Sequence, residues 1–287
     1  MATMRTARLF ERIAGAVVAL LVVVLVGIVR CRRETARRVD ELRESANRGR
    51  EAVFTPEELA GLPTPVRAYF EATLEEGQPY IDSVRLRQAG ELRLGDASSS
   101  WRPFTATQYI TVEPPGFLWD ASISLGPFIS LRVRDLFRDG RGSAVVALFG
   151  VVPLDSAEST PQLDEGELIR YLAEAVWYPT ALLPSEGVRW ESVDERTATA
   201  TVEDGDITAS LTFSFNEENE VTQVYTESRH RRVAGGFEPT PWSGYWRAYE
   251  RRNGVRIPTE GEVVWHLPDG ELNAWRGRVT EISYDDW

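Results

Sequence analysis

The 287-residue sequence contains no lysine, one cysteine and two histidines. A single cysteine, Cys31, excludes an internal disulfide bond and a cysteine-rich metal site. Neither His230 nor His266 has a second histidine at the HxH, HxxxH or HExxH spacing typical of metal ligands. His230 lies in a basic stretch, Arg229–Arg232, that we expect to be solvated. We therefore expect neither a metal nor a cofactor.

Motifs for common catalytic chemistries are missing as well. The sequence has no GxSxG nucleophile elbow. It also has no phosphate-binding loop, because Gly235-Gly236 lacks both a strand-to-helix context and a lysine. An enzyme is therefore the less favoured interpretation.

Charge is distributed unevenly along the chain, which carries a formal net charge of -12. Residues 1–50 contain eleven arginines and five acidic residues, a net charge of +6, so the remainder carries -18. An acidic body repels the phosphates of nucleic acids. We therefore expect no nucleic-acid partner.

A run of seventeen uncharged, mostly aliphatic residues occupies positions 13–29. That length is at the short end for a bilayer-spanning helix, and the flanking Arg12 and Arg30 can extend the span by snorkelling. Arginines follow the run where a signal peptide would have small residues for cleavage, so we expect an uncleaved single-pass anchor. The predicted organisation is an N-terminal tail at 1–12, a transmembrane helix at 13–29, a charged helical stalk at 30–54 and one soluble domain at 55–287.

Helical and extended patterns alternate in the soluble domain. Thr64-Pro65 and Thr160-Pro161 are typical helix starts, and apolar spacing predicts helices over 64–76 and 164–178. Elsewhere, period-2 alternation and short turns predict strands that pair antiparallel with their sequence neighbours. The first predicted strand begins at residue 82, and the others lie at 101–112, 117–125, 129–137, 144–152, 188–192, 197–203, 207–215, 221–232, 245–252, 255–267 and 272–284.

These patterns predict an α+β fold: a large curved antiparallel sheet, a meander shaped like a half-barrel, with helices on one face. A helix followed by strands occurs twice. We therefore also consider that the domain consists of two similar halves, 55–155 and 156–287.

Four short motifs carry a resemblance that spans nearly the whole soluble domain: Leu62–Tyr69, Pro114–Trp119, Trp177–Pro184 and Trp275–Arg278. In these motifs the chain resembles an uncharacterised family of single-pass prokaryotic membrane proteins, defined by a domain of unknown function. In architecture alone it is similar to the half-barrels of periplasmic lipoprotein carriers. The second resemblance implies a body outside the cytoplasm.

The arginines around the apolar run favour the opposite orientation. Three precede residues 13–29 and five follow within nine residues, and the positive-inside rule then places the body in the cytoplasm. We adopt the orientation implied by the carrier-like architecture and expect a cell-membrane protein with an extracytoplasmic body.

Glu174 stands out among the many carboxylates. It follows Arg170 at i,i+4 spacing, and it shares an i,i+3 stripe with Tyr171 and Trp177. At the edge of a cavity, an acid in this stripe would have a raised pKa. The alternative is an ordinary surface ion pair beside core aromatic residues.

A second stripe of this predicted helix, about a third of a turn away, indicates how the helix packs. Leu168, Leu172 and Ala175 recur at the spacing of one buried stripe, and we expect them to contact the sheet. The stripe of Glu174 would then lie at the edge of that contact, where a pocket can open.

Tryptophan is the remaining signal, because all nine residues lie after position 100. Such side chains suit an amphipathic cavity, although core packing in a large sheet explains them as well. Arg276 and Arg278 share one face of a strand and would bind an anionic headgroup or pair with acids such as Glu260 and Glu262.

Together these features favour a membrane-anchored protein that binds an apolar or amphipathic ligand such as a lipid. The alternatives are a hydrolase that uses Glu174 with arginine or tyrosine partners, and a structural or scaffolding domain. The candidate ligand-binding residues are Tyr171, Glu174, Trp177, Arg170, Trp119, Trp246, Arg276 and Arg278.

Overall fold

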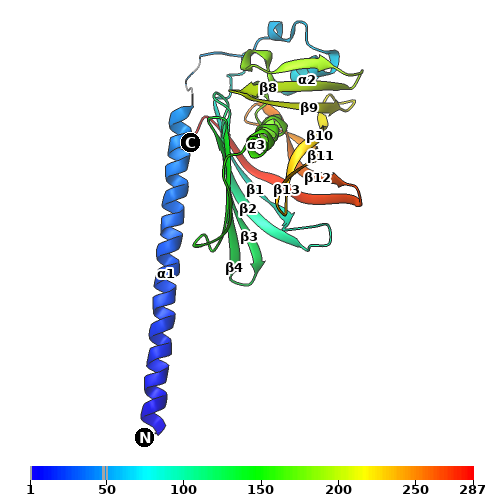
Figure 1. Ribbon diagram of the computed structural model, residues 1–287. Coiled ribbons are helices and arrows are strands. Elements are labelled where there is room, and N and C mark those ends of the chain that lie inside the picture. Colours follow the sequence, from blue (N-terminus) through cyan, green and yellow to red (C-terminus); the bar gives the residue numbers. More distant parts are fainter. Residues whose placement is uncertain (1, 47–48, 50) are drawn as a thin grey trace.

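The computed structural model describes residues 2–46, 49 and 51–287, without the side chains of residues 2–13, 16, 17, 20 and 21. A long N-terminal helix, α1 (Ala2–Ser45), lies beside a body built mainly of strands (Figure 1). The helix is longer than the body, so its N-terminal part extends beyond it.

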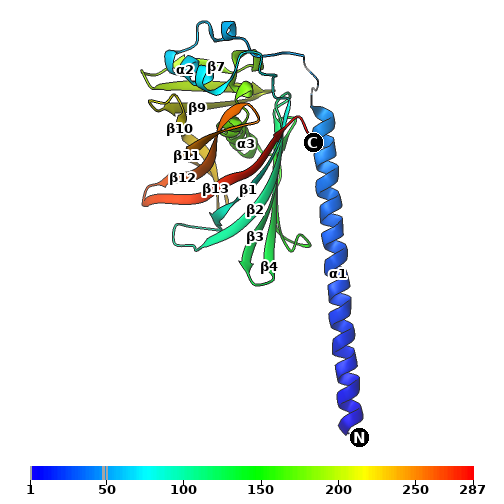
Figure 2. The same ribbon diagram turned by 180° about the vertical axis from the view of Figure 1, so that it is seen from behind.

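Thirteen strands of the described chain form one curved antiparallel sheet, in the order β6-β5-β4-β3-β2-β1-β13-β12-β11-β10-β9-β8-β7. The first meander contains β1 (Ser83–Arg93), β2 (Trp101–Thr111), β3 (Gly116–Gly126), β4 (Ile129–Arg138), β5 (Arg141–Leu148) and β6 (Val152–Ala157). The second contains β7 (Arg189–Ser192), β8 (Thr197–Asp204), β9 (Ile207–Phe215), β10 (Val221–Val233), β11 (Gly236–Arg252), β12 (Val255–Leu267) and β13 (Gly270–Tyr284). The two meanders meet where β1 pairs with β13, as seen from behind in Figure 2.

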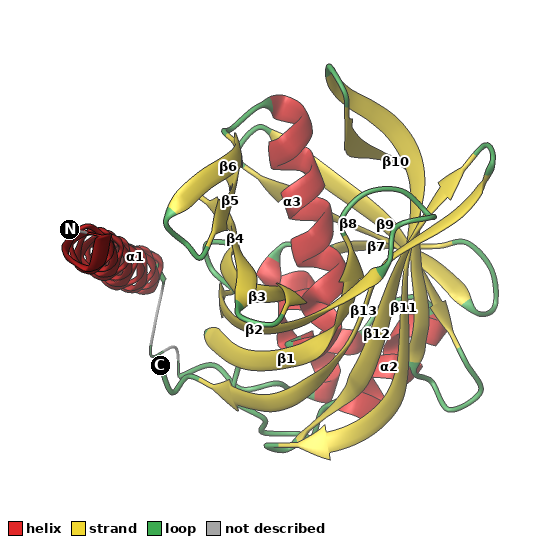
Figure 3. Ribbon diagram, turned by 90° about the horizontal axis from the view of Figure 1, so that it is seen from below, coloured by secondary structure: helices red, strands yellow, loops and turns green. Residues whose placement is uncertain are grey.

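The core lies on the concave side of this sheet, where the helix α3 (Pro161–Glu174) sits (Figure 3). Thr160 caps the start of α3, because its hydroxyl accepts a hydrogen bond from the Leu163 N–H at 3.2 Å. The helix buries Leu168 and Leu172, as the sequence predicts. The fold therefore places one helix inside a half-barrel, with side chains of the sheet around it.

The other helices frame this core. The helix α2 (Thr64–Thr73) packs Tyr69 against Phe215 of β9, on the same concave side, with ring centroids 5.8 Å apart. Near its C-terminal end, α1 instead packs Leu42 against Leu118 and Leu136, on the convex face. Short 3-10 helices complete the set: η1 (Pro56–Leu59), η2 (Ala175–Trp177), η3 (Pro179–Leu182) and η4 (Pro184–Glu186).

The large curved antiparallel sheet of half-barrel form is confirmed, but several predicted boundaries are wrong. The strand predicted over 144–152 is a hairpin, because Phe149 and Gly150 adopt positive φ and turn the chain between β5 and β6. The helix predicted over 164–178 ends at Glu174 and tightens into η2. Tyr178 leaves the helical region, with φ -140° and ψ 65°, because the residue before a proline disfavours the α conformation.

The N-terminal segment bears on the predicted anchor. Among the described residues, no helix has a stretch both long and apolar enough to cross a membrane. The predicted span at 13–29 lies partly outside the described residues, because five of its side chains are left out. The anchor therefore stays a sequence-based prediction.

Candidate functional site

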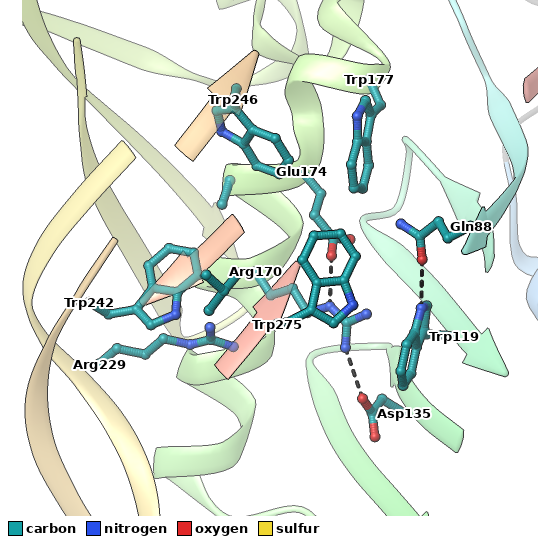
Figure 4. A pocket seen from close by; sticks show the side chains of 12 residues that line it. Gln88, Trp119, Asp135, Arg170, Glu174, Trp177, Arg229, Trp242, Trp246 and Trp275 are labelled. Carbon is teal, nitrogen blue, oxygen red and sulfur yellow. Dashed lines mark hydrogen bonds and ion pairs between the residues drawn. The ribbon is translucent and has the colours of Figure 1, made fainter. Parts of the chain in front are cut away.

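A cavity of about 190 Å³ opens between α3 and the concave face of the sheet. Its walls come from α3 and η2 on one side and from strands of both meanders on the other (Figure 4). Five tryptophans line it: Trp119, Trp177, Trp242, Trp246 and Trp275. The cavity is therefore aromatic over much of its surface.

Two of these indoles make the end of the cavity nearest η2. Trp177 and Trp246 meet edge to face, with centroids 5.0 Å apart and planes 74° apart. The Trp177 N–H donates to the carbonyl of Pro258 at 3.0 Å, which satisfies its polar atom in the core. Trp177 is thereby fixed in place, and Trp246 packs against it.

A row of glycines gives the rings on the sheet their space. Gly90 pairs with Gly277, and Gly277 pairs with Gly261, so three neighbouring strands lack a side chain at one level. A Cβ atom on Gly261 would lie 2.6 Å from the Trp246 ring, and one on Gly277 would lie 2.6 Å from the Trp275 ring. Both indoles therefore lie over the backbone where other residues would carry side chains.

On the β1 and β3 side, a hydrogen bond between two side chains forms the wall. The Trp119 N–H donates to the Gln88 side-chain oxygen at 2.7 Å. The amide nitrogen of Gln88 then points towards the interior of the pocket (Figure 4). This wall therefore presents a donor to whatever occupies the cavity.

Arg170 and two carboxylates form a buried ionic triad at the α3 side. The Arg170 guanidinium donates to Glu174 at 2.8 Å and to Asp135 at 2.9 Å. Glu174 also accepts a hydrogen bond from the Gln108 amide at 2.5 Å. Burial raises the pKa of Asp135, and the adjacent Arg170 opposes that shift.

The triad differs from both alternatives that the sequence left open. Arg170 and Glu174 are only 16% and 12% exposed, so this is not a solvated surface pair. Glu174 is also held by two donors, which leaves it poorly placed to act as a free acid. We conclude that the triad mainly fixes α3 against β2 and β4 and shapes the pocket.

Arg229 is a second cation of the pocket, half-buried, and it reaches the pocket through a β-bulge. Thr226 pairs with Trp242 and Arg229 pairs with Thr240, so two residues of β10 oppose one residue of β11. Strict alternation from Thr226 would direct Arg229 to the convex face. The extra residue turns it to the concave face instead.

Within the pocket, Arg229 lies over aromatic rings. Its guanidinium carbon is 4.7 Å from the Trp242 ring and 5.5 Å from the Trp265 ring. One N–H donates to the carbonyl of Gly166 at 2.9 Å. Burial lowers the pKa of Arg229 to about 10, so it remains a cation at neutral pH.

The nearby Glu167 of α3 is buried, with 8% of its surface exposed. No described residue hydrogen bonds to its Oε2 atom. Burial raises the pKa of Glu167 to about 7, against the attraction of Arg170 and Arg229. Its charge therefore changes within the physiological pH range.

The structure brings five of the predicted site residues together and separates the other three. Those in the pocket are Trp119, Arg170, Glu174, Trp177 and Trp246. Tyr171 is buried elsewhere in the core, where its hydroxyl donates to the carbonyl of Val112 at 3.2 Å. It does not line the cavity, because its side chain leaves α3 in another direction.

Arg276 and Arg278 lie on the convex face and are exposed, so they do not line the pocket with the helix residues. Arg276 pairs with Glu91 at 2.6 Å and stacks over Trp101 at 4.4 Å. The acids expected as partners, Glu260 and Glu262, are the cross-strand neighbours of Arg278 and Arg276, but both form their ion pairs with Arg247. Alternation along β13 explains the separation, because Trp275 and Gly277 point to the concave side.

The sequence-based reasoning missed Gln88, Asp135, Arg229, Trp242 and Trp275 as pocket residues. For Arg229 the prediction of a solvated position is wrong, and the bulge is the physical reason. The clustering of tryptophan and tyrosine at 242–249 was a usable signal for Trp242.

A second polar cluster lies on the convex face. The Ser243 hydroxyl is 2.8 Å from the His266 Nε2, and His266 Nδ1 is 3.5 Å from Glu271. The residue types match a serine hydrolase triad, but Ser243 is fully buried and has no access to a substrate. This cluster therefore gives no support to the hydrolase interpretation. No group of metal-ligating side chains is found in the part of the chain that the structure describes.

Comparison with known proteins identifies the family. No curated protein matches this sequence. A LolA superfamily protein from Nitrosomonas europaea is similar in structure, with a TM-score of 0.35 and 11% identity over 78% of this chain and 93% of that one. A beta-barrel-like protein of the domain of unknown function DUF1849, from Brucella abortus, gives a TM-score of 0.25 and 10% identity over 72% of this chain and 99% of that one. The model of DUF6920, a family of unknown function, matches residues 60–284, and the chain therefore belongs to that family.

Proposed function

We propose that this protein binds an apolar or amphipathic ligand in the tryptophan-lined pocket beneath α3. The observation that carries the proposal is the cavity itself, which is lined by five indoles and a small number of fixed polar groups. Ligand sites are typically mostly apolar concavities with a few convergent polar groups. A solid core would have none of these features.

The volume limits what the pocket holds. At about 190 Å³ it is smaller than the several hundred Å³ of sites for drug-sized ligands. A cavity of about 150 Å³ is enough for a benzene molecule. The occupant is therefore a single substituted ring or a short apolar segment, either alone or as the end of a longer lipid.

The sequence supports a second part of the proposal. The uncharged run at 13–29 is what favours attachment to a membrane. The proposed orientation, with the body outside the cytoplasm, goes against the arginine count and follows the resemblance of the sequence to periplasmic carriers. Such an attachment would keep the pocket close to a supply of amphipathic molecules.

A neutral probe tests the binding function. We expect the full-length protein in mild detergent to bind 3-phenylpropanamide, measured by isothermal titration calorimetry. Trp275→Leu should weaken binding roughly tenfold, because it removes one aromatic wall. Trp101→Phe is the matched control, since Trp101 lies on the convex face and its loss should leave the affinity unchanged.

Two results would contradict the proposal. Absence of binding by the folded protein would favour the scaffolding alternative. Equal weakening by both tryptophan variants would place the probe outside the pocket.

A further inference from the structure

Most of the pocket's polar atoms that lack a hydrogen-bond partner among the described residues are donors. The indole N–H groups of Trp242 and Trp246 are buried, and no described residue accepts a hydrogen bond from either. The rings are only 2% and 5% exposed. Most buried donors in proteins have a partner, and leaving one unpaired costs about 1–3 kcal/mol. These two atoms therefore mark where a ligand acceptor would be favoured.

Arg229 adds charge to these donors. Its guanidinium has five N–H groups, and only one of them has a hydrogen-bond partner among the residues described. It forms no ion pair with any described carboxylate, whereas Arg170 binds two. The indole faces of Trp242 and Trp265 stabilise its positive charge without consuming its N–H groups.

The acceptors of the pocket are largely in use. Three of the four carboxylate oxygens of Asp135 and Glu174 accept hydrogen bonds from Arg170 or Gln108. A cationic ligand would have to compete with Arg170 for these oxygens and would also be repelled by Arg229. An anion would instead accept hydrogen bonds from donors that already point into the pocket.

We propose that the ligand carries a carboxylate, which Arg229 binds together with the Trp242 N–H, while its apolar part lies between Trp177, Trp246 and Trp275. This inference rests on the proposed binding function and names the chemical class of the ligand. A planar carboxylate matches the fork of a guanidinium, and it is small enough to leave room for one ring in the cavity. Arg229 is the anchor, and the triad of Arg170 is the fixed wall opposite.

The charges around Arg229 imply a pH dependence. They are Glu167, Arg170 and Glu174 of α3 and Asp135 of β4. Arg170 is neutralised by Asp135 and Glu174, so Glu167 is the carboxylate that competes with a ligand for Arg229. Because burial raises the pKa of Glu167 to about 7, we expect a carboxylate to bind more tightly below that pH, where Glu167 is neutral.

Three probes with one skeleton test the inference: 3-phenylpropanoate, 3-phenylpropanamide and 3-phenylpropylammonium. We expect the full-length protein to bind the carboxylate at least tenfold more tightly than the amide, and the ammonium most weakly. Arg229→Gln should abolish the preference for the carboxylate, so that the carboxylate and the amide bind with equal affinity. Arg276→Gln, on the convex face, is the matched control.

The outcomes separate the two proposals. Equal affinity for all three probes overturns the carboxylate inference and leaves the binding function standing, whereas no binding of any probe overturns both. An unchanged preference for the carboxylate in Arg229→Gln overturns the role of Arg229.

If Arg229→Gln does not fold, the pH dependence of carboxylate affinity in the wild-type protein tests the inference instead. Carboxylate affinity that falls as the pH rises through about 7, while amide affinity stays constant, supports the inference. A flat carboxylate profile contradicts it. Glu167→Gln should remove the dependence.

Discussion

Replacing Gly261 with alanine tests how the tryptophan rings are seated on the sheet. The new Cβ would lie 2.6 Å from one atom of the Trp246 ring and 2.9 Å from the next. Restoring an ordinary contact of 3.4 Å requires the ring to move by about 0.8 Å. Trp177 also packs against Trp246, with centroids 5.0 Å apart, and leaves the ring less room to move.

The expected cost follows from these contacts. Overpacking a core typically costs about 1–3 kcal/mol, and the loss of a glycine from a strand returns about 0.5–1 kcal/mol. We therefore expect Gly261→Ala to lower the free energy of unfolding by about 1–2 kcal/mol and to change the near-ultraviolet circular dichroism of the indoles. Chemical denaturation of the full-length protein measures the first effect.

Gly166→Ala is the matched control. Gly166 lies in α3, and its new Cβ would come no closer than 4.0 Å to any neighbour. Alanine also has the better helix propensity, so this variant should be slightly more stable than the wild type. If Gly261→Ala behaves like Gly166→Ala, with an unchanged indole spectrum, the seating of Trp246 over Gly261 is refuted.

Three further predictions concern charge and topology. Because burial raises the pKa of Glu167 from 4.5 to about 7, its protonated carboxyl stabilises the folded protein fully below pH 4.5, and this contribution is lost as the pH rises from 4.5 to about 7. Wild-type stability should therefore fall by up to about 3 kcal/mol over that range, and Glu167→Gln should flatten the decline in denaturation midpoints. Glu174→Gln weakens a buried triad and should lower the free energy of unfolding by about 1–3 kcal/mol in chemical denaturation. Glu71→Gln, in an exposed i,i+4 pair, is the control and should change it by less than about 0.5 kcal/mol. Equal effects of the two variants would argue against burial of the triad. A reporter that works only outside the cytoplasm should be active when it is fused after Trp287. Activity of a reporter that works only in the cytoplasm would reverse the proposed orientation.

Periodicity was enough to predict the sheet but not its interruptions. In β9, alternation places Ala209, Leu211 and Phe213 in the core, as period-2 reasoning requires. The hairpin between β5 and β6 was missed because its two strands are joined by Phe149, Gly150 and Val151, within a nearly continuous apolar run. A turn without polar residues gives almost no sequence signal.

The pocket, too, could be predicted from the sequence only in part. Helical spacing brought Arg170, Glu174 and Trp177 together, because all three lie within two turns of α3 and η2. Asp135 joins them only through the packing of β4 against α3, which no local pattern encodes. Arg229 was assigned to the solvent because its neighbours are charged, and a single extra residue in β10 reverses the face to which it points.

The family assignment agrees with the resemblance read from the sequence motifs, since both give a domain of unknown function. That assignment fixes the extent of the domain, residues 60–284, and provides no activity. The functional conclusion therefore depends on the pocket.

Photochemical labelling shows whether a ligand occupies the tryptophan-lined pocket, because it identifies the residues that the ligand touches. A phenyl diazirine of single-ring size is added to the full-length protein, illuminated, and its attachment sites are mapped by tandem mass spectrometry. We expect labels on residues 170–177 and 242–246, and we expect excess 3-phenylpropanamide to suppress them. Labels confined to the convex face, or labels at the pocket that excess probe does not suppress, would contradict it.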